Sequence, residues 1–179
     1  MNIVFLDIDG VLQPYDSENR FYEINHKTKE LVNLLSHKYQ IDYTKYSIYD
    51  ILSVYYDWDE SAVNRLKYVL DQTTSKIIIT SDWRSFKLPN KMHDLLTIRG
   101  LDNYWLCDND IINDELSLVK KRVNEINKSL KKYEIDNYVV LDDMKGLKEY
   151  FPNNSVITYD YMNNIDMENC IKILKKKRG

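Results

Sequence analysis

The stretch from Asn2 to Val11 reads NIVFLDIDGV, and it predicts how the chain folds. Its apolar half is the continuous run expected of a strand buried in a parallel sheet. Asp7 and Asp9 follow this run, and Gly10 permits a sharp turn behind them. Because residues i and i+2 of an extended chain face the same way, both carboxylates can serve one centre at the C-terminal end of the strand.

Two later segments repeat this pattern. The segment KIIITS ends its apolar run in Thr80 and Ser81, and the segment YVVLDD ends in Asp142 and Asp143. Open parallel α/β sheets build their sites at the C-terminal ends of strands. A solvated turn explains any one of these ends, but it does not explain carboxylates, hydroxyls and more carboxylates at one edge. Crowded carboxylates suit a hard divalent cation such as Mg²⁺, and the set is typical of phosphoryl transfer.

These motifs carry a family resemblance. FLDIDGV, IIITS and VVLDD stand in the order of the first, second and fourth motifs of the haloacid dehalogenase superfamily, which the chain resembles outside residues 13–57. With WDESAVNRLKYVL before KIIITSDWR and RVNEINKSL before YVVLDD, the chain looks most like small phosphatase-like domains, some attached to RNA repair proteins. The resemblance implies an α/β fold, a Rossmann-like doubly wound parallel sheet with a small cap insertion.

The resemblance also implies chemical roles. Asp7 would attack phosphorus and form an aspartyl phosphate. Asp9 would act first as the general acid and then as the general base, and its backbone carbonyl would bind the metal. Thr80 and Ser81 would hydrogen-bond the oxygens of the transferring phosphoryl group.

The resemblance assigns the remaining aspartates to the metal site. Asp143 would be a direct ligand to Mg²⁺, and Asp142 would orient either a basic residue or a water on the metal. Asp7 and Asp9 complete the candidate ligand set. The cation would offset the repulsion between the nucleophile and the phosphate.

The third motif of the superfamily needs a Lys or Arg, and three candidates stand in a row: Lys120, Lys121 and Arg122. The apolar residues nearby form a helical stripe: Leu116, Val119, Val123, Ile126 and Leu130. This stripe leaves Lys120 and Arg122 on its flanks and Lys121 opposite. The resemblance of RVNEI and its distance from Asp142 favour Lys121 or Arg122 as the phosphate-binding cation.

Trp83 and Arg84 follow the second motif and allow two interpretations each. Arg84 would clamp a substrate phosphate or base, or it would pair with a nearby carboxylate. Trp83 would offer a stacking surface, or it would belong to the core, and we favour the core.

Length and composition indicate one domain spanning residues 1–179. The net charge of −3 gives no general bias towards nucleic acid. Basic residues nevertheless crowd one predicted helix, namely Lys120, Lys121, Arg122, Lys128, Lys131 and Lys132. They would follow a phosphate backbone or, more commonly for such runs, form a solvated helix face.

Residues 13–57 separate the first motif from the helix that leads to the second, and in this superfamily an insertion at that place is a cap. A helix is predicted from Thr28 to His37. Several tyrosines follow it: Tyr39, Tyr43, Tyr46, Tyr49, Tyr55 and Tyr56. They would stack on a nucleotide or on the end of a nucleic acid, or they would pack the cap on the core, which we favour.

The remaining predictions concern strands and location. Strands are predicted at residues 2–6, 76–80, 103–107, 138–142 and 155–158, with helices between them. The chain begins with a core strand rather than a signal peptide, and no apolar run approaches the length of a membrane span. We therefore expect a cytoplasmic protein without a membrane partner.

Together these features predict a Mg²⁺-dependent phosphohydrolase acting on a small phosphorylated metabolite or nucleotide. A phosphatase acting on RNA or DNA ends is the first alternative. A non-catalytic metal-binding interaction module is the second, although intact Asp7 and Asp9 argue against it.

Overall fold

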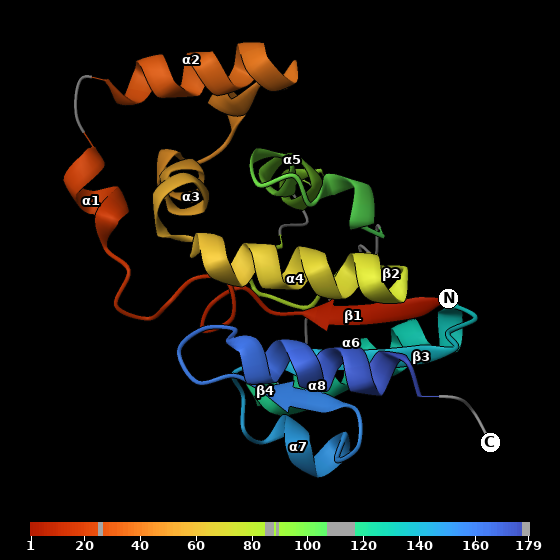
Figure 1. Ribbon diagram of the computed structural model, residues 1–179. Helices are drawn as coiled ribbons and strands as arrows, with labels where there is room; N and C mark the ends of the chain where they lie inside the picture. The colour runs from red at the N-terminus through yellow and green to blue at the C-terminus, as the bar shows by residue number, and fades with distance from the viewer. Residues whose placement is uncertain (25–26, 85–87, 89, 107–116, 177–179) are drawn as a thin grey trace.

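Figure 1 shows the computed structural model of the chain, in which helices surround a small central sheet. The structure describes residues 1–24, 27–84, 88, 90–106 and 117–176. Leu116, the first residue of the predicted helical stripe, lies outside the described residues.

The sheet has four parallel strands in the order β2-β1-β3-β4. They are β1 (Asn2–Leu6), β2 (Ser75–Ile79), β3 (Asn137–Asp142) and β4 (Ser155–Ile157). Each lies within one residue of its predicted bounds. Parallel neighbours require crossover connections, and these place helices over the sheet. The predicted Rossmann-like α/β fold is confirmed.

Alternate residues of β1 face two separate apolar layers. Val4 and Leu6 belong to a large core cluster that includes residues of α4 (Glu60–Thr73) and α8 (Asn164–Leu174). Ile3 and Phe5 belong to a second cluster on the opposite face, with residues of α6 (Leu118–Lys132) and α7 (Leu147–Tyr150). Burial on both faces explains why the four residues of β1 that follow Asn2 are all apolar.

Local signals fix the starts of the two helices that share the first layer. The side chain of Asp59 accepts a hydrogen bond from the backbone N of Ala62 and so caps the start of α4. Asn163 and Asp166 form a capping box at the start of α8. Helix α4 turns an apolar face to the core: Val63, Leu66, Val69 and Leu70 are all buried.

The described part of the insertion at residues 13–57 consists of short helices joined by turns and irregular segments. It contains α1 (Asn19–Glu23), α2 (Thr28–Tyr39), η1 (Tyr43–Lys45), α3 (Ile48–Leu52) and η2 (Ser53–Asp57). In Figure 1 these helices stand apart from the sheet, beyond α4 and beside α5 (Lys91–Ile98). The chain leading to α1 passes the end of the sheet to which the arrow of β1 points.

The strand predicted at residues 103–107 is wrong in its described part. That segment holds a 3-10 helix, η3 (Asp102–Tyr104), and then a single bridge between Trp105 and Ile77 of β2. Asp and Asn favour turns over strand pairing, which leaves only Trp105 and Leu106 to extend beside β2. The last predicted residue, Cys107, lies outside the described residues.

No helix in the described part of the chain combines the length and apolarity needed to cross a membrane.

Candidate active site

Three strand ends meet at one edge of the sheet. The backbone N of Asp7 donates to the carbonyl of Leu141 at 3.0 Å, and the N of Thr80 donates to the carbonyl of Leu6 at 2.8 Å. These bonds continue the ladder one residue beyond β1 and β2. The residues predicted from sequence to share an edge therefore do so.

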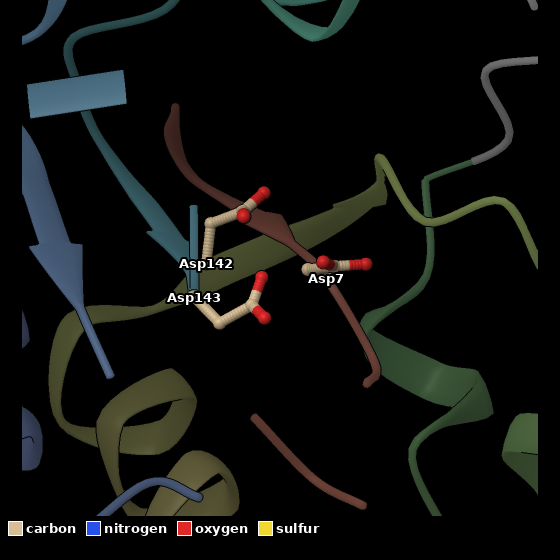
Figure 2. A group of neighbouring side chains, drawn as sticks. All are labelled: Asp7, Asp142 and Asp143. Atoms are coloured by element: carbon tan, nitrogen blue, oxygen red, sulfur yellow. The ribbon is translucent and has the colours of Figure 1, made fainter. Parts of the chain in front are cut away.

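Three carboxylates form the centre of this edge. Each of Asp7, Asp142 and Asp143 contributes an oxygen, and these oxygens lie within 4.8 Å of one another. Figure 2 shows Asp142 and Asp143 at the end of one strand and Asp7 on the strand beside it. Asp7 and Asp142 are buried and Asp143 is half-buried. Oxygen ligands at this spacing suit Mg²⁺, and the charge of a cation would relieve their mutual repulsion.

Arg122 lies against this cluster. Its Nη1 is 2.5 Å from Oδ2 of Asp142 and 3.3 Å from Oδ2 of Asp7, and its side chain is only 4% exposed. Among the described residues no ion pair joins Lys120 or Lys121 to these carboxylates. Of the three candidates for the third motif, the structure brings Arg122 to the site.

Burial also changes the pKa of Asp142, one of the three clustered carboxylates. Loss of water raises the pKa of Asp142, Arg122 opposes the rise, and the negative charge of Asp7 adds to it. A cation at the cluster would favour the ionised form of Asp142.

Thr80 and Ser81 lie at the end of β2, beside Asp7. Thr80 is buried, and its Oγ1 has no hydrogen-bond partner within the described parts of the chain. Among the described residues, Ser81 Oγ accepts a single long bond, 3.4 Å, from the backbone N of Trp83. A buried hydroxyl without a partner is costly, and a phosphoryl oxygen bound at the cluster would satisfy it.

Asp9 stands apart from the three clustered carboxylates. Its Oδ2 accepts a hydrogen bond of 3.0 Å from Nε1 of Trp83. Asp9 is partly exposed, but partial loss of water raises the pKa of its carboxyl group. The hydrogen bond from Trp83 opposes this rise, and the negative charge of Asp7 adds to it. Arg20, on the insertion helix α1, also opposes the rise.

Arg84 has a protein partner. Its Nη2 is 2.6 Å from Oε2 of Glu125 on α6, and its Nε donates to the carbonyl of Ser81 at 3.1 Å. The alternative in which Arg84 pairs with a carboxylate is therefore what the structure shows. A role for Arg84 in phosphate binding stays a prediction.

Residues of the insertion reach the site although the sequence did not mark them. Tyr15 Oη donates to Oδ2 of Asp143, and a Cβ on Gly10 would lie 2.7 Å from that hydroxyl and 2.8 Å from Cβ of Asp143. Gly10 also has a φ of +71°, so both space and backbone require glycine. Tyr15 stands among many tyrosines, and no pattern singled it out.

Arg20 is the second such residue. Its Nη1 lies 2.6 Å from Oγ of Ser53 and 3.1 Å from Oδ2 of the buried Asp57. Ser53 in turn donates to the side chain of Gln13, close behind Asp9. These bonds join the start of the insertion, at Gln13 and Arg20, to its end, at Ser53 and Asp57. No local sequence signal predicts such a contact between distant segments.

The basic residues of α6 divide along the helix. Arg122 is near its start, and a rise of 1.5 Å per residue places Lys132 about 15 Å farther along the axis. Arg122 is thus the basic residue of α6 that pairs with the clustered carboxylates. Lys128, Lys131 and Lys132 lie progressively farther along the helix.

Comparison with known proteins agrees with this site. Neither the curated proteins nor the solved structures gave a match. A protein family described as "HAD domain in Swiss Army Knife RNA repair proteins" matches residues 3–169. That span covers both the sheet and the carboxylate cluster. The chain accordingly belongs to this family of HAD domains, within the haloacid dehalogenase superfamily.

Proposed function

We propose that this domain hydrolyses phosphate monoesters with Mg²⁺ as its cofactor, through an aspartyl phosphate on Asp7. The observation that carries the proposal is the position of Asp7. It is buried at the convergence of three strand ends, against Arg122 and beside two further carboxylates. Membership of a phosphatase-type hydrolase family supports the same chemistry.

Each residue has a definite task in the first step. A carboxylate oxygen of Asp7 forms a bond to phosphorus while the bond from phosphorus to the leaving oxygen breaks. The leaving oxygen keeps the electron pair and takes a proton from Asp9. Arg122 and the hydroxyl of Thr80 would hold the phosphoryl oxygens as their charge is redistributed.

The second step restores the protein. Asp9, now ionised, takes a proton from water, the oxygen of that water bonds to phosphorus, and the bond from phosphorus to Asp7 breaks. Asp7, Asp143 and the carbonyl of Asp9 would hold Mg²⁺, with Asp142 oriented by Arg122. The cation would supply positive charge that lets an anionic phosphate approach an anionic nucleophile.

The proposed site needs only a phosphate monoester group, so a phosphorylated metabolite or nucleotide is the smallest substrate that we propose for it. A phosphorylated RNA or DNA end is the second candidate, and two observations favour it. The family is named for RNA repair proteins. Tyr15, whose hydroxyl donates to Asp143 of the cluster, is 61% exposed. Exposed rings beside a phosphate site can stack on the bases of a strand.

The test is turnover of p-nitrophenyl phosphate by the purified chain, with Mg²⁺ and with a chelator. We expect turnover that needs the cation and that falls at least about a thousandfold in Asp7→Asn. Asp71→Asn is the matched control, because Asp71 is exposed on α4 and bonds only Tyr104 among the described residues. Undiminished activity in pure, folded Asp7→Asn would sink the mechanism. Absence of turnover on a panel of metabolites and oligonucleotides would favour the interaction module.

A further inference from the structure

The indole of Trp83 is joined to the side chain of Asp9. Nε1 of Trp83 lies 3.0 Å from Oδ2 of Asp9, across 74 residues of sequence. Trp83 is the third residue after Thr80 at the end of β2, and Asp9 is in the turn that follows β1. The contact therefore joins the loop that follows β1 to the loop that follows β2.

The Trp83 ring is held from two sides. It packs edge to face on Trp58, with the ring centroids 5.8 Å apart and the planes at 62°. Trp58 is only 2% exposed, so it is a fixed surface of the core. On α5, Nζ of Lys91 lies 5.9 Å from the centroid of the Trp83 ring. The contacts with Trp58 and Lys91 thus hold the indole in the orientation in which its N–H donates to Asp9.

The chemistry of an indole gives this contact a direction. An indole N–H can only donate, so the oxygen of Asp9 that faces it must be an acceptor in every protonation state. In the described residues no hydrogen bond occupies the other oxygen, Oδ1. The proton of an acidic Asp9 is therefore favoured on Oδ1, because the unprotonated oxygen of a carboxyl group is the better acceptor for the indole N–H.

We propose that Trp83 is a positioning residue that fixes Oδ2 of Asp9, so that Oδ1 delivers the proton to the leaving oxygen. This inference rests on the proposed phosphohydrolase activity. As the proton leaves Oδ1, negative charge develops over the whole carboxylate, and the bond from Nε1 to Oδ2 becomes charge-assisted and stronger. Trp83 then stabilises the ionised form of Asp9 at the moment the bond from phosphorus to the leaving oxygen breaks.

A consequence follows for the choice of leaving group. An alkoxide or phenoxide needs the proton of Asp9 as it leaves, whereas a dinitrophenolate is stable without it. Removing the N–H of Trp83 should therefore slow the reaction of phenyl phosphate and spare that of dinitrophenyl phosphate. The quantity to compare is kcat/KM, because it reports only the steps up to formation of the aspartyl phosphate.

The decisive variant is Trp83→Phe, which keeps an aromatic ring against Trp58 and Lys91 and removes the donor, although the phenyl ring is smaller than the indole. We expect kcat/KM for phenyl phosphate to fall about ten- to hundredfold, the range for loss of a hydrogen bond to a charged group. We expect kcat/KM for dinitrophenyl phosphate to change less than about twofold. Trp105→Phe, a half-buried indole near His93, is the matched control and should change neither value.

A double variant separates positioning from packing. If Trp83 acts through Asp9, adding Trp83→Phe to Asp9→Asn should cause little further loss with phenyl phosphate. Equal losses with both substrates in Trp83→Phe, or additive losses in the double variant, would overturn the inference and leave Trp83 a packing residue. A wild-type chain that turns over neither substrate would instead overturn the proposed function.

Discussion

At the level of single residues, Asp142 and Asp143 are neighbours in sequence with different surroundings. Asp142 is fully buried, and its carboxylate is engaged by Arg122 at 2.5 Å and by the backbone N of Met144 at 2.9 Å. Asp143 is half-buried, and its side chain is bonded by the exposed Tyr15. Asp142 is thus held by the protein, and Asp143 has more freedom to bind a cation.

This difference predicts separate effects of their removal. Asp143→Ala should raise the Mg²⁺ concentration for half-maximal turnover at least about tenfold, with little change in melting temperature. Asp142→Ala takes away the closer partner of a buried guanidinium and should cost on the order of 3 kcal/mol of folding free energy. Mg²⁺ titrations of activity and urea unfolding of both variants check this. Equal or reversed effects on the Mg²⁺ requirement would show that the two roles are exchanged.

At the level of elements, the loop after β2 is tied to α6 by the pair of Arg84 and Glu125. Their side chains are 10% and 4% exposed, and Nη2 of Arg84 also reaches the carbonyl of Thr80 at 3.5 Å. The guanidinium thus supports the backbone that presents Thr80 and Ser81.

Arg84→Ala should therefore damage both folding and turnover. We expect a loss of about 3 kcal/mol in unfolding free energy, because the buried carboxylate of Glu125 loses a cation that pairs with it. Chemical unfolding of Arg84→Ala and of Arg65→Ala compares an arginine paired with a buried carboxylate with one that bonds Asn164 and Ser61 at the exposed surface. If Arg84→Ala kept wild-type stability but lost affinity for phosphate, Arg84 would be a substrate clamp instead.

A second link between elements joins the insertion to α5 through Asp94. Tyr46 Oη and Nζ of Lys45 lie 2.5 and 3.0 Å from Oδ2 of Asp94, and Tyr43 Oη donates to its carbonyl at 2.6 Å. Burial raises the pKa of Asp94, but the hydrogen bonds from Tyr46, His93 and Lys45 outweigh it and hold the pKa below its ordinary value.

This shift predicts an acid-sensitive anchor for the insertion. Since the pKa of Asp94 is lower in the folded chain, its contribution to stability is full above the unfolded value, about pH 4, and is lost as pH falls through the folded value. The melting temperature of Asp94→Asn should lie below that of the wild type at neutral pH, and the two should converge in acid. Asp16→Asn, on an exposed loop, should follow the wild type at every pH. A constant gap between Asp94→Asn and the wild type would contradict the shift.

At the level of the whole molecule, the sequence predicted what depends on continuous apolar runs. The apolar runs IVFL, III and VVL are buried on both faces of the sheet, so the ends of these strands, and with them Asp7, Thr80 and Asp142, were located to within a residue. In the strand predicted at 103–107, the described residues are exposed or half-buried. There the turn residues Asp102 and Asn103 prevailed.

The parts of the site that escaped prediction come from contacts between distant segments. Tyr15 meets Asp143 across 128 residues, and Trp83 meets Asp9 across 74. Neither contact leaves a periodic trace in sequence. The choice between Lys121 and Arg122 was open for a related reason. Helical phase places Arg122 on a flank of the apolar stripe and Lys121 opposite, but the resemblance of RVNEI favoured either residue, and only packing against the sheet buries Arg122.

At the same scale, the distribution of charge along α6 provides a test that separates a small substrate from a polymer. A strand whose terminal phosphate sits at Asp7 would extend past the start of α6, where Lys120 is exposed, and not past its end, where Lys131 is exposed about 16 Å farther along the helix. Each phosphate contact with a single strand contributes about 0.7 to the slope of log affinity against log salt.

For a phosphorylated oligonucleotide we therefore expect kcat/KM to fall steeply as the salt concentration rises. Lys120→Gln should reduce the slope of log kcat/KM against log salt by about 0.7, whereas Lys131→Gln should leave that slope unchanged. With p-nitrophenyl phosphate the dependence on salt should be shallow, and neither substitution should alter it. Measuring kcat/KM for both substrates across a salt series in the wild type and the two variants checks this. Equal slopes for the oligonucleotide and the small ester would exclude the polymer as a substrate and leave the phosphorylated metabolite or nucleotide. The reason is that a site that contacts only the terminal phosphate makes no contact with the other phosphates of the strand, and so shows no additional dependence on salt.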